Sequence, residues 1–442
     1  MEISTPIITT LSLLLFSLQF PFSLSTLAKY FPTHHYLTTI HREHGRVENS
    51  TSASTASSSS SSSSKNAVRY EKRYFTQRLD HFNFEPQGFT SFQQKFLVND
   101  THWGGASAPI FVYAGNEGRI EWFAENTGYY GESLPYGSKD VAYNKSLVGY
   151  LTTTQALADY AALILDLKNN LSSQSSPVVL FGGSYGGMLA AWFRLKYPHV
   201  AIGALASSAP ILQFDGLCSP YSFYDIVTRD FKRESENCYE VIKRSWKEMD
   251  DAINKGVGIR ELKRAFNICK LYGAVNIYYN YSGNVDCFAL HDDDPHDTLY
   301  GWDWQSCSEL LLAVGGVSNS SMFPPSRYNF TEQVADCQES NEGIPPKPHW
   351  ITTEFGGFDI KRTLKRFGSN IIFFNGLRDP WSGGGVLESL SESLIAIAAH
   401  KGAHHVDLRF STNEDPKWLT EIREKEVQII KKWLTEYYRD SA

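Results

Sequence analysis

The sequence has no surplus of positive charge. Its 442 residues include 41 Lys and Arg against 48 Asp and Glu, which gives a formal net charge of −7. Proteins that bind nucleic acid usually carry a basic face that neutralises phosphates. We therefore expect no nucleic-acid partner.

Beyond its amino end, the sequence has no apolar run long enough to cross a membrane. Residues 7–24 are apolar, but Gln19, Pro21 and several serines interrupt them. We predict a signal peptide over residues 1–24, with a signal anchor as the alternative because no Lys or Arg precedes Lys29. The protein should then enter the secretory pathway, to the cell exterior, the cell wall or a lysosome-like vacuole, without stable membrane association.

Acceptor sites for N-linked glycans also indicate export. The N-x-S/T pattern occurs at Asn49, Asn99, Asn144, Asn170, Asn280, Asn319 and Asn329. Residues 25–70 contain a serine run, 57–64, that cannot bury enough apolar surface to order itself. We interpret residues 25–70 as a disordered leader or a pro-segment.

The sequence lacks the paired C-x-x-C spacing of a zinc site. Its cysteines all fall in one region, at Cys218, Cys238, Cys269, Cys287, Cys307 and Cys337. An even count within one region of an exported chain predicts disulfides, although the spacing does not choose the pairs. Residues 291–296 (H-D-D-D-P-H) are the one metal-like cluster, and their spacing favours a solvated acidic loop, so we predict no metal site.

What the sequence does contain is a strand, a sharp turn and a helix around Ser184. The apolar run 178–181 leads into G-G-S-Y-G-G, and a helical pattern follows as far as residue 197. In a G-x-S-x-G elbow, glycines allow close backbone approach while the strained serine projects its hydroxyl above the sheet. The motif predicts a nucleophile if a base can reach it, and an ordinary flexible loop if none can.

A carboxylate and a histidine follow in the order that such a nucleophile needs. Asp379 lies just past the apolar run 369–375, and His404 and His405 follow the run 394–398. Catalytic side chains gather at the carboxyl ends of parallel strands, so the order Ser, Asp, His fits a catalytic triad. The alternatives are a turn aspartate before a proline and solvated loop histidines.

Neighbouring residues point in different directions, so at most one of the paired histidines can face Ser184. Asp407 and Arg409 lie close enough in sequence to hold the other histidine.

Several segments together match one peptidase family. They are Y-F-T-Q-R-L-D-H-F (74–82), P-I-F-V-Y-A-G-N-E-G (109–118), Y-G-E-S-L-P-Y-G (130–137), the elbow and its helix (181–199), N-G-L-R-D-P-W-S-G-G-G (375–385) and G-A-H-H-V-D-L-R (402–409). With these segments the chain resembles the serine peptidases that include lysosomal prolyl carboxypeptidase and dipeptidyl peptidase II. The resemblance runs from about residue 70 to the carboxyl end and looks closest to plant-like prolyl carboxypeptidases.

The resemblance implies a serine exopeptidase that cleaves next to proline and releases the carboxyl-terminal residue through an acyl-enzyme. Carried over by position, Ser184 is the nucleophile, Asp379 the acid and His404 the base. Backbone N–H groups of Tyr185 and of the loop at Asn116 would form the oxyanion hole.

Other residues support this machinery in the same reading. His405 and Arg409 would lie behind the triad, and Met188, Leu312 and Trp381 would line an apolar pocket for proline. Leu312 stands where the family often has a methionine. Triad, oxyanion hole and pocket suffice for the reaction, so we expect no cofactor.

Other readings stay open at this point. A dipeptidyl peptidase II-like enzyme, a catalytically impaired form of the family and a different serine hydrolase would share this elbow. Peptides with proline near a terminus are the expected partners, and a homodimer is left open.

Apolar strands that alternate with helices predict an α/β-hydrolase core. We expect strands near residues 109–114, 178–182, 202–208, 370–374 and 393–398, and helices near 147–168, 186–197 and 414–438. The core would comprise residues 71–211 and 349–442. Residues 212–348 would form an inserted, mainly helical cap that contains disulfides.

One core strand is missing from this pattern. A buried strand is expected between residue 119 and the helix near Lys145, yet residues 119–146 contain no apolar β-branched run of four. The junction 126–129 looks like a splice across it. Loss of an interior strand leaves two rows of backbone groups in need of partners, so we expect lower stability or activity unless a flanking strand shifts.

Overall fold

A computed structural model describes residues 70–84, 90–117, 133–144, 147–254, 298–341 and 343–441. The predicted signal peptide and all but the last residue of the predicted leader lie outside these residues. So do the acidic segment 291–296, Cys269 and Cys287.

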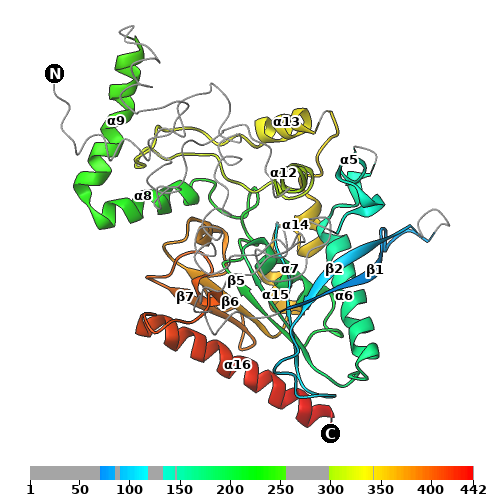
Figure 1. The fold of residues 1–442 in the computed structure, drawn as a ribbon. Helices are drawn as coiled ribbons and strands as arrows, with labels where there is room; N and C mark the ends of the chain where they lie inside the picture. The colour runs from blue at the N-terminus through cyan, green and yellow to red at the C-terminus, as the bar shows by residue number, and fades with distance from the viewer. Residues whose placement is uncertain are drawn as a thin grey trace, which may run out of the picture.

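A five-stranded parallel sheet forms the centre of the molecule (Figure 1). Its order is β3 (Ile110–Tyr113), β4 (Val178–Gly183), β5 (Gly203–Ser207), β6 (Ile371–Gly376) and β7 (Leu394–Ala399). The middle strands are buried on both faces, which explains why they read as continuous apolar runs. The α/β-hydrolase prediction is confirmed, and each expected strand lies within two residues of its predicted bounds.

Helices cover both faces of the sheet. Val178 and Leu180 pack with α6 (Thr153–Asn170), α7 (Tyr185–Lys196) and α15 (Ile360–Phe367). Val179 and its neighbours on the other face pack against α16 (Lys417–Ser441), which crosses beneath the sheet in Figure 1. Alternate residues of one strand therefore contribute to two separate cores.

Helix α6 begins later than the sequence predicts. A short 3₁₀ turn occupies Val148–Tyr150, and Thr152 then caps the helix by accepting the N–H of Gln155 at 3.3 Å. The cap satisfies a backbone donor that has no partner inside the helix. Similar 3₁₀ turns occupy Pro135–Gly137, Pro380–Gly384 and Val406–Leu408, and the short helix α5 spans Lys139–Ala142.

An antiparallel hairpin, β1 (Glu71–Arg78) and β2 (Ser91–Val98), forms a second sheet beside α6. His81 Nε2 lies 2.7 Å from Asp159 Oδ1, and Gln77 donates to the Asp159 carbonyl at 2.9 Å. These contacts fasten the hairpin to α6. We did not predict the hairpin from the sequence.

Within the described residues, the parallel sheet ends at β3 and no strand lies between β2 and β3. Residues 118–132, which contain the proposed splice, lie outside the description.

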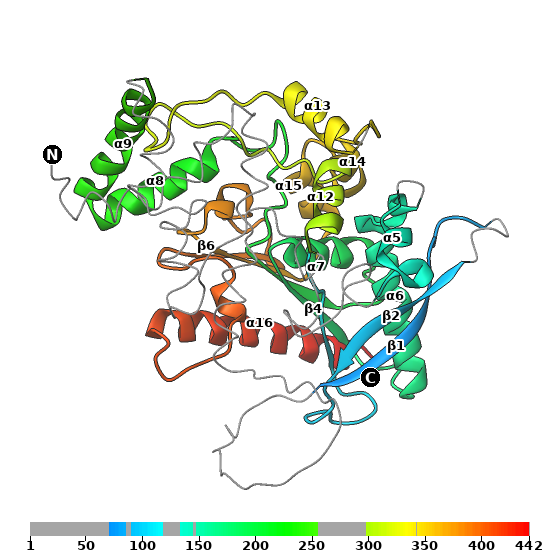
Figure 2. The ribbon, with the colours of Figure 1, turned by 45° about the horizontal axis from the view of Figure 1, so that its top comes forward.

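The segment between β5 and β6 carries the cap, and its described elements are mainly helical. They are α8 (Ser222–Glu234), α9 (Glu236–Asn254), α12 (Thr298–Ser308) and α13 (Phe330–Ser340), followed by α14 (Trp350–Phe355). Figure 2 shows α8 and α9 on one side of the cap and α12 and α13 on the other.

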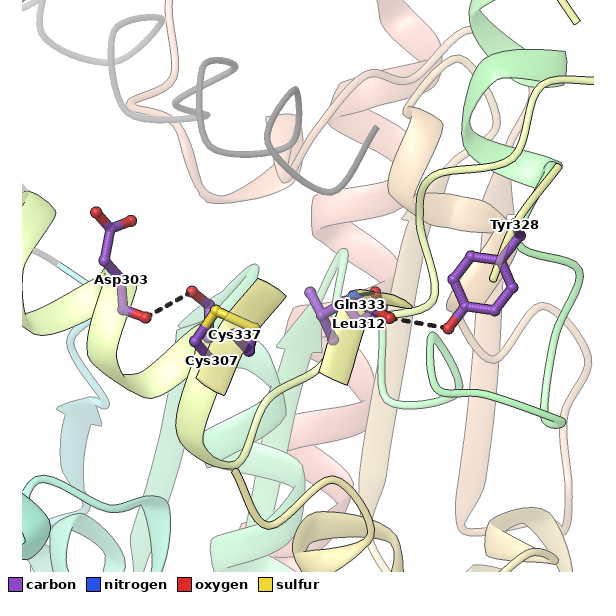
Figure 3. The surroundings of a disulfide bond; sticks show 7 residues. Asp303, Cys307, Leu312, Tyr328, Gln333 and Cys337 are labelled. Atoms are coloured by element: carbon purple, nitrogen blue, oxygen red, sulfur yellow. Dashed lines mark hydrogen bonds between the residues drawn. A yellow bond between two sulfur atoms is a disulfide. The ribbon is translucent and has the colours of Figure 1, made fainter. Parts of the chain in front are cut away.

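A disulfide joins Cys307 of α12 to Cys337 of α13 (Figure 3). The predicted presence of a disulfide in the cap is therefore confirmed. Cys218 and Cys238 are free thiols. No helix among the described residues combines the length and apolarity that a bilayer crossing requires.

Candidate active site

Ser184 sits in a strained turn between β4 and α7. Its φ of 57° and ψ of −125° are unusual for a residue with a side chain. Its N–H donates to the Ser207 carbonyl at 2.9 Å, which ties the turn to the end of β5. The strain is thus held by the neighbouring strand.

The glycines of the elbow are needed for close packing. A Cβ on Gly182 would lie 1.9 Å from the carbonyl oxygen of Gly186. A Cβ on Gly186 would lie 2.0 Å from the carbonyl oxygen of Gly115, in the loop after β3. No side chain fits at either position, so the loop after β3 rests directly on the elbow.

Asp379 and His404 meet although they follow different strands. Asp379 Oδ2 lies 2.7 Å from His404 Nδ1, and Asp379 Oδ1 accepts the N–H of Trp381 at 3.0 Å. The aspartate side chain is fully buried. A buried carboxylate in this position fixes the imidazole tautomer that carries hydrogen on Nδ1.

The other ring nitrogen of His404 is free to accept a proton. Nε2 is buried and has no hydrogen-bond partner among the described residues. A ring nitrogen in this state can act as a general base toward a hydroxyl.

Backbone contacts hold the aspartate and histidine loops together. Arg378 N–H donates to the Gly402 carbonyl at 3.0 Å, and a Cβ on Gly376 would lie 2.4 Å from the backbone of Gly402. The His405 N–H donates to the Ser208 hydroxyl at 2.9 Å, just past β5. The ends of β4, β6 and β7 therefore bring Ser184, Asp379 and His404 to the same edge of the sheet.

His405 lies behind the site rather than on Asp379. Its φ is 33°, its ring centroid lies 4.5 Å from that of His404, and its ring would touch a Cβ on Gly183. The Arg409 carbonyl accepts from Arg423 Nη2 at 2.8 Å, which attaches the end of the histidine loop to α16.

Asp407 is held by strand β5. Its Oδ1 accepts the Ser207 hydroxyl at 2.5 Å. Burial raises the pKa of Asp407, and burial together with repulsion from Asp407 raises the pKa of Glu426 on α16. Two buried carboxyls thus stand behind the histidine loop, and sequence reasoning did not single out Glu426.

Asn116 acts through its side chain in this structure. Its Nδ2 donates to the Gly183 carbonyl at 3.1 Å, and its Oδ1 accepts the Gly186 N–H at 2.9 Å. The sequence suggested its backbone N–H as an oxyanion donor and missed these bonds. They fix the loop after β3 to both sides of Ser184.

Tyr185 begins α7, so its N–H belongs to the group that lacks a partner within the helix. Its side chain reaches into a buried polar network with Thr153, Gln305 and Glu309. Sequence reasoning missed these three residues, although Glu309 ends the W-x-x-C-x-E motif of residues 304–309.

The expected pocket residues fall into two apolar clusters. Met188 is buried in the main core, and Leu312 packs against the same cluster. Trp381 packs with cap aromatics, and its ring centroid lies 5.0 Å from that of Phe223 on α8. The described residues contain no group of three side chains suited to bind a metal.

Comparison with known proteins shows the family of this chain. The family model described as serine carboxypeptidase S28 matches residues 77–290 and 274–426. The lysosomal Pro-X carboxypeptidase of Bos taurus is 35% identical over 454 residues, covering 84% of this chain and 89% of that protein. The Homo sapiens enzyme of the same name is 35% identical over 458 residues, covering 85% and 90%.

Solved structures overlap the chain loosely. A peroxisomal α/β-hydrolase of Saccharomyces cerevisiae is 12% identical, with 82% of this chain and 90% of that chain covered and a TM-score of 0.36. The extent of the sequence matches is decisive. This chain belongs to the serine carboxypeptidase S28 family and is a serine-type peptidase.

Proposed function

We propose that this chain cleaves the peptide bond after a proline and releases the carboxyl-terminal residue. The observation that carries the proposal is the 2.7 Å contact between Asp379 and His404, with His404 Nε2 buried and unbonded among the described residues. The preference for proline rests on relatives named Pro-X carboxypeptidase.

In this mechanism Ser184 Oγ attacks the peptide carbonyl while His404 Nε2 takes the hydroxyl proton. Asp379 stabilises the imidazolium through Nδ1–H. Collapse of the tetrahedral intermediate breaks the C–N bond, and His404 returns the proton to the leaving amine. Water then repeats these steps on the acyl-enzyme to release the shortened peptide.

The negative oxygen of each tetrahedral intermediate would lie between the Tyr185 N–H and a backbone N–H of the loop at Asn116. Removal of one such donor typically costs about 10²–10³ in turnover. The two hydrogen bonds of the Asn116 side chain support this geometry, because they fix the loop to the elbow.

For the proline ring we propose a slot near Met188, Leu312 and Trp381. Their apolar surroundings suit a ring with no hydrogen-bond donor. Such a slot supplies only ~1–3 kcal/mol per methylene-sized difference between substrates. We therefore expect a preference for proline rather than an absolute requirement.

We also propose a place in the secretory pathway or in a lysosome-like compartment. Both curated relatives reported above are named lysosomal. The acceptor asparagines that the structure describes are all exposed, namely Asn99, Asn144, Asn170, Asn319 and Asn329. The solution mass after glycan removal, from light scattering, decides whether the protein is a homodimer.

The decisive test is labelling by a fluorophosphonate together with peptide cleavage. The secreted protein should label once per chain, and Ser184→Ala should abolish labelling while its melting temperature is kept. A folded wild-type chain that does not label would overturn the proposal and identify an impaired form.

Peptides blocked at one end then separate the two exopeptidase readings. An amino-blocked peptide ending in Pro-X should be cleaved, and its carboxyl-terminal amide should not. The reverse pattern, with cleavage only from a free amino end, would identify a dipeptidyl peptidase. Faster cleavage of esters that lack proline would identify a different serine hydrolase.

A further inference from the structure

A buried chain of polar side chains lies behind the proposed oxyanion hole. Glu309 follows α12 of the cap, and its Oε1 accepts both the N–H of Thr153 at 2.6 Å and its hydroxyl at 2.8 Å. The Thr153 hydroxyl lies 3.0 Å from the Tyr185 hydroxyl, which also lies 3.1 Å from Gln305 Nε2. One consistent direction runs through the chain: Gln305 donates to Tyr185, Tyr185 to Thr153 and Thr153 to Glu309.

These groups come from separate parts of the fold. Thr153 is the first residue of α6, Tyr185 is the first residue of α7, and Gln305 and Glu309 belong to the cap. The Trp302 ring of α12 also packs against the Tyr185 ring, with centroids 5.1 Å apart. The cap therefore holds Tyr185 by both its ring and its hydroxyl.

A carboxyl at this depth is costly to keep. Glu309 is 2% exposed, and its Oε2 has no hydrogen-bond partner among the described residues. Burial raises its pKa to about 7, against the opposing effect of its bonds to Thr153. Because a buried carboxyl with an unbonded oxygen destabilises the fold, we expect Glu309 to have a role beyond filling space in the core.

Anchoring the side chain of Tyr185 also fixes the position of its backbone N–H, and this affects the proposed reaction. Its N–H is the oxyanion donor of the mechanism above, and it follows Ser184, whose backbone is strained. A displacement of about 1 Å in a catalytic group can cost about 10²-fold in rate.

We propose that Glu309 is a positioning residue that, through Thr153 and Tyr185, fixes the oxyanion N–H and couples it to the seating of the cap. The inference rests on the proposed peptidase function. It predicts a loss in kcat rather than in KM, because the oxyanion exists only in the transition state and the intermediates.

Two substitutions test the chain of bonds. Tyr185→Phe removes only the hydroxyl, and Glu309→Leu removes the acceptor. Each should lower kcat by roughly 10–100-fold, with KM within about threefold. Glu309→Gln keeps an acceptor oxygen for Thr153 and should restore kcat to within about threefold of wild type.

The rate of fluorophosphonate labelling gives a second readout. The phosphoryl oxygen of the probe occupies the oxyanion hole, so the labelling rate should fall in parallel with kcat. The final extent of labelling should stay at one per chain, because it reports the fraction of chains in which the turn at Ser184 is folded. Tyr438→Phe and Glu421→Leu, on the exposed side of α16, are matched controls that should change neither value.

The outcomes are distinct. Unchanged kcat and labelling rate in Tyr185→Phe would overturn the inference while leaving the peptidase proposal intact. If Glu309→Gln loses as much activity as Glu309→Leu, the carboxylate does not act as a replaceable acceptor and the inference is wrong. If wild type itself neither labels nor cleaves, the proposed function has failed instead.

Discussion

At the residue scale, Asp379 is the group whose charge matters most to the proposed chemistry. Asp379→Asn keeps the size of the side chain but places an amide against His404 Nδ1, which favours the tautomer with hydrogen on Nε2. Nε2 could then no longer take a proton from Ser184. We expect kcat to fall by about 10³–10⁴-fold at an unchanged melting temperature.

Steady-state cleavage of an amino-blocked Pro-X peptide measures this loss. Asp440→Asn, near the end of α16, is a matched control that should leave kcat unchanged. Activity of Asp379→Asn within tenfold of wild type would show that another group orients His404.

At the element scale, the packing of α16 against β5 requires a glycine at position 203, because Trp433 fills the space where a side chain would lie. A Cβ on Gly203 would lie 2.4 Å from the Trp433 ring. Gly203→Ala should lower the free energy of unfolding by about 1–3 kcal/mol, since an added methyl must displace a buried indole. Gly149→Ala, where the methyl meets open space, is the control.

Urea denaturation measures this effect, and a second substitution identifies its cause. Trp433→Leu in the Gly203→Ala background should cost less than the sum of the two single changes, because it removes the clash. If the losses in unfolding free energy of the two single variants simply add, the destabilisation by Gly203→Ala does not come from a clash with Trp433.

The end of the sheet at β3, the outermost strand on this side in the described residues, carries a second prediction at this scale. A strand inserted before Tyr129 should raise the secreted yield and the melting temperature, because it restores the buried strand that the sequence pattern lacks. A scrambled polar insert of the same length is the control. Equal yield and melting temperature for both chains would show that the sheet needs no further strand.

The sequence predicted the elements whose pattern is local and left out those that depend on distant contacts. The elbow, its helix and the loops of Asp379 and His404 follow from short runs of residues. The β1–β2 hairpin escaped notice because E-K-R-Y-F-T-Q-R is rich in charge, and its pairing with β2 is settled only in space. Asn116 and Glu309 act across separations of 67 and 156 residues, which no local pattern reveals.

At the scale of the whole molecule, buried carboxyl groups set the response to pH. Burial raises the pKa of Asp159 from 3.8 to about 6 and that of Glu309 from 4.5 to about 7. Burial raises the pKa values of Asp407 and Glu426 as well, and repulsion from Asp407 raises that of Glu426 further. The folded state therefore holds protons that the unfolded chain releases near pH 4.

The resulting stability is complete below pH 4, and it is lost progressively as the pH rises from there through the folded pKa values of about 6 and about 7. We expect the melting temperature to be higher at pH 5 than at pH 8 by on the order of 5 °C. Calorimetry across this range measures the shift, and Glu426→Gln should reduce it. A melting temperature that rises with pH would contradict the assignment.

The two edge strands of the sheet in the described residues, β3 and β7, support different parts of the catalytic machinery. Ser184 and Asp379 follow the inner strands β4 and β6, and His404 follows the edge strand β7, which is six residues long and packs against α16. The loop with Gly115 and Asn116 follows β3, the other edge strand in the described residues, which is only four residues long and has no fully buried residue. As the temperature rises, the loop with Gly115 and Asn116 should therefore lose its fixed position before the loops of the triad do. On gentle heating, kcat should therefore fall at a lower temperature than the extent of fluorophosphonate labelling at Ser184. Between the two temperatures the serine would still react, but peptide turnover would be slow.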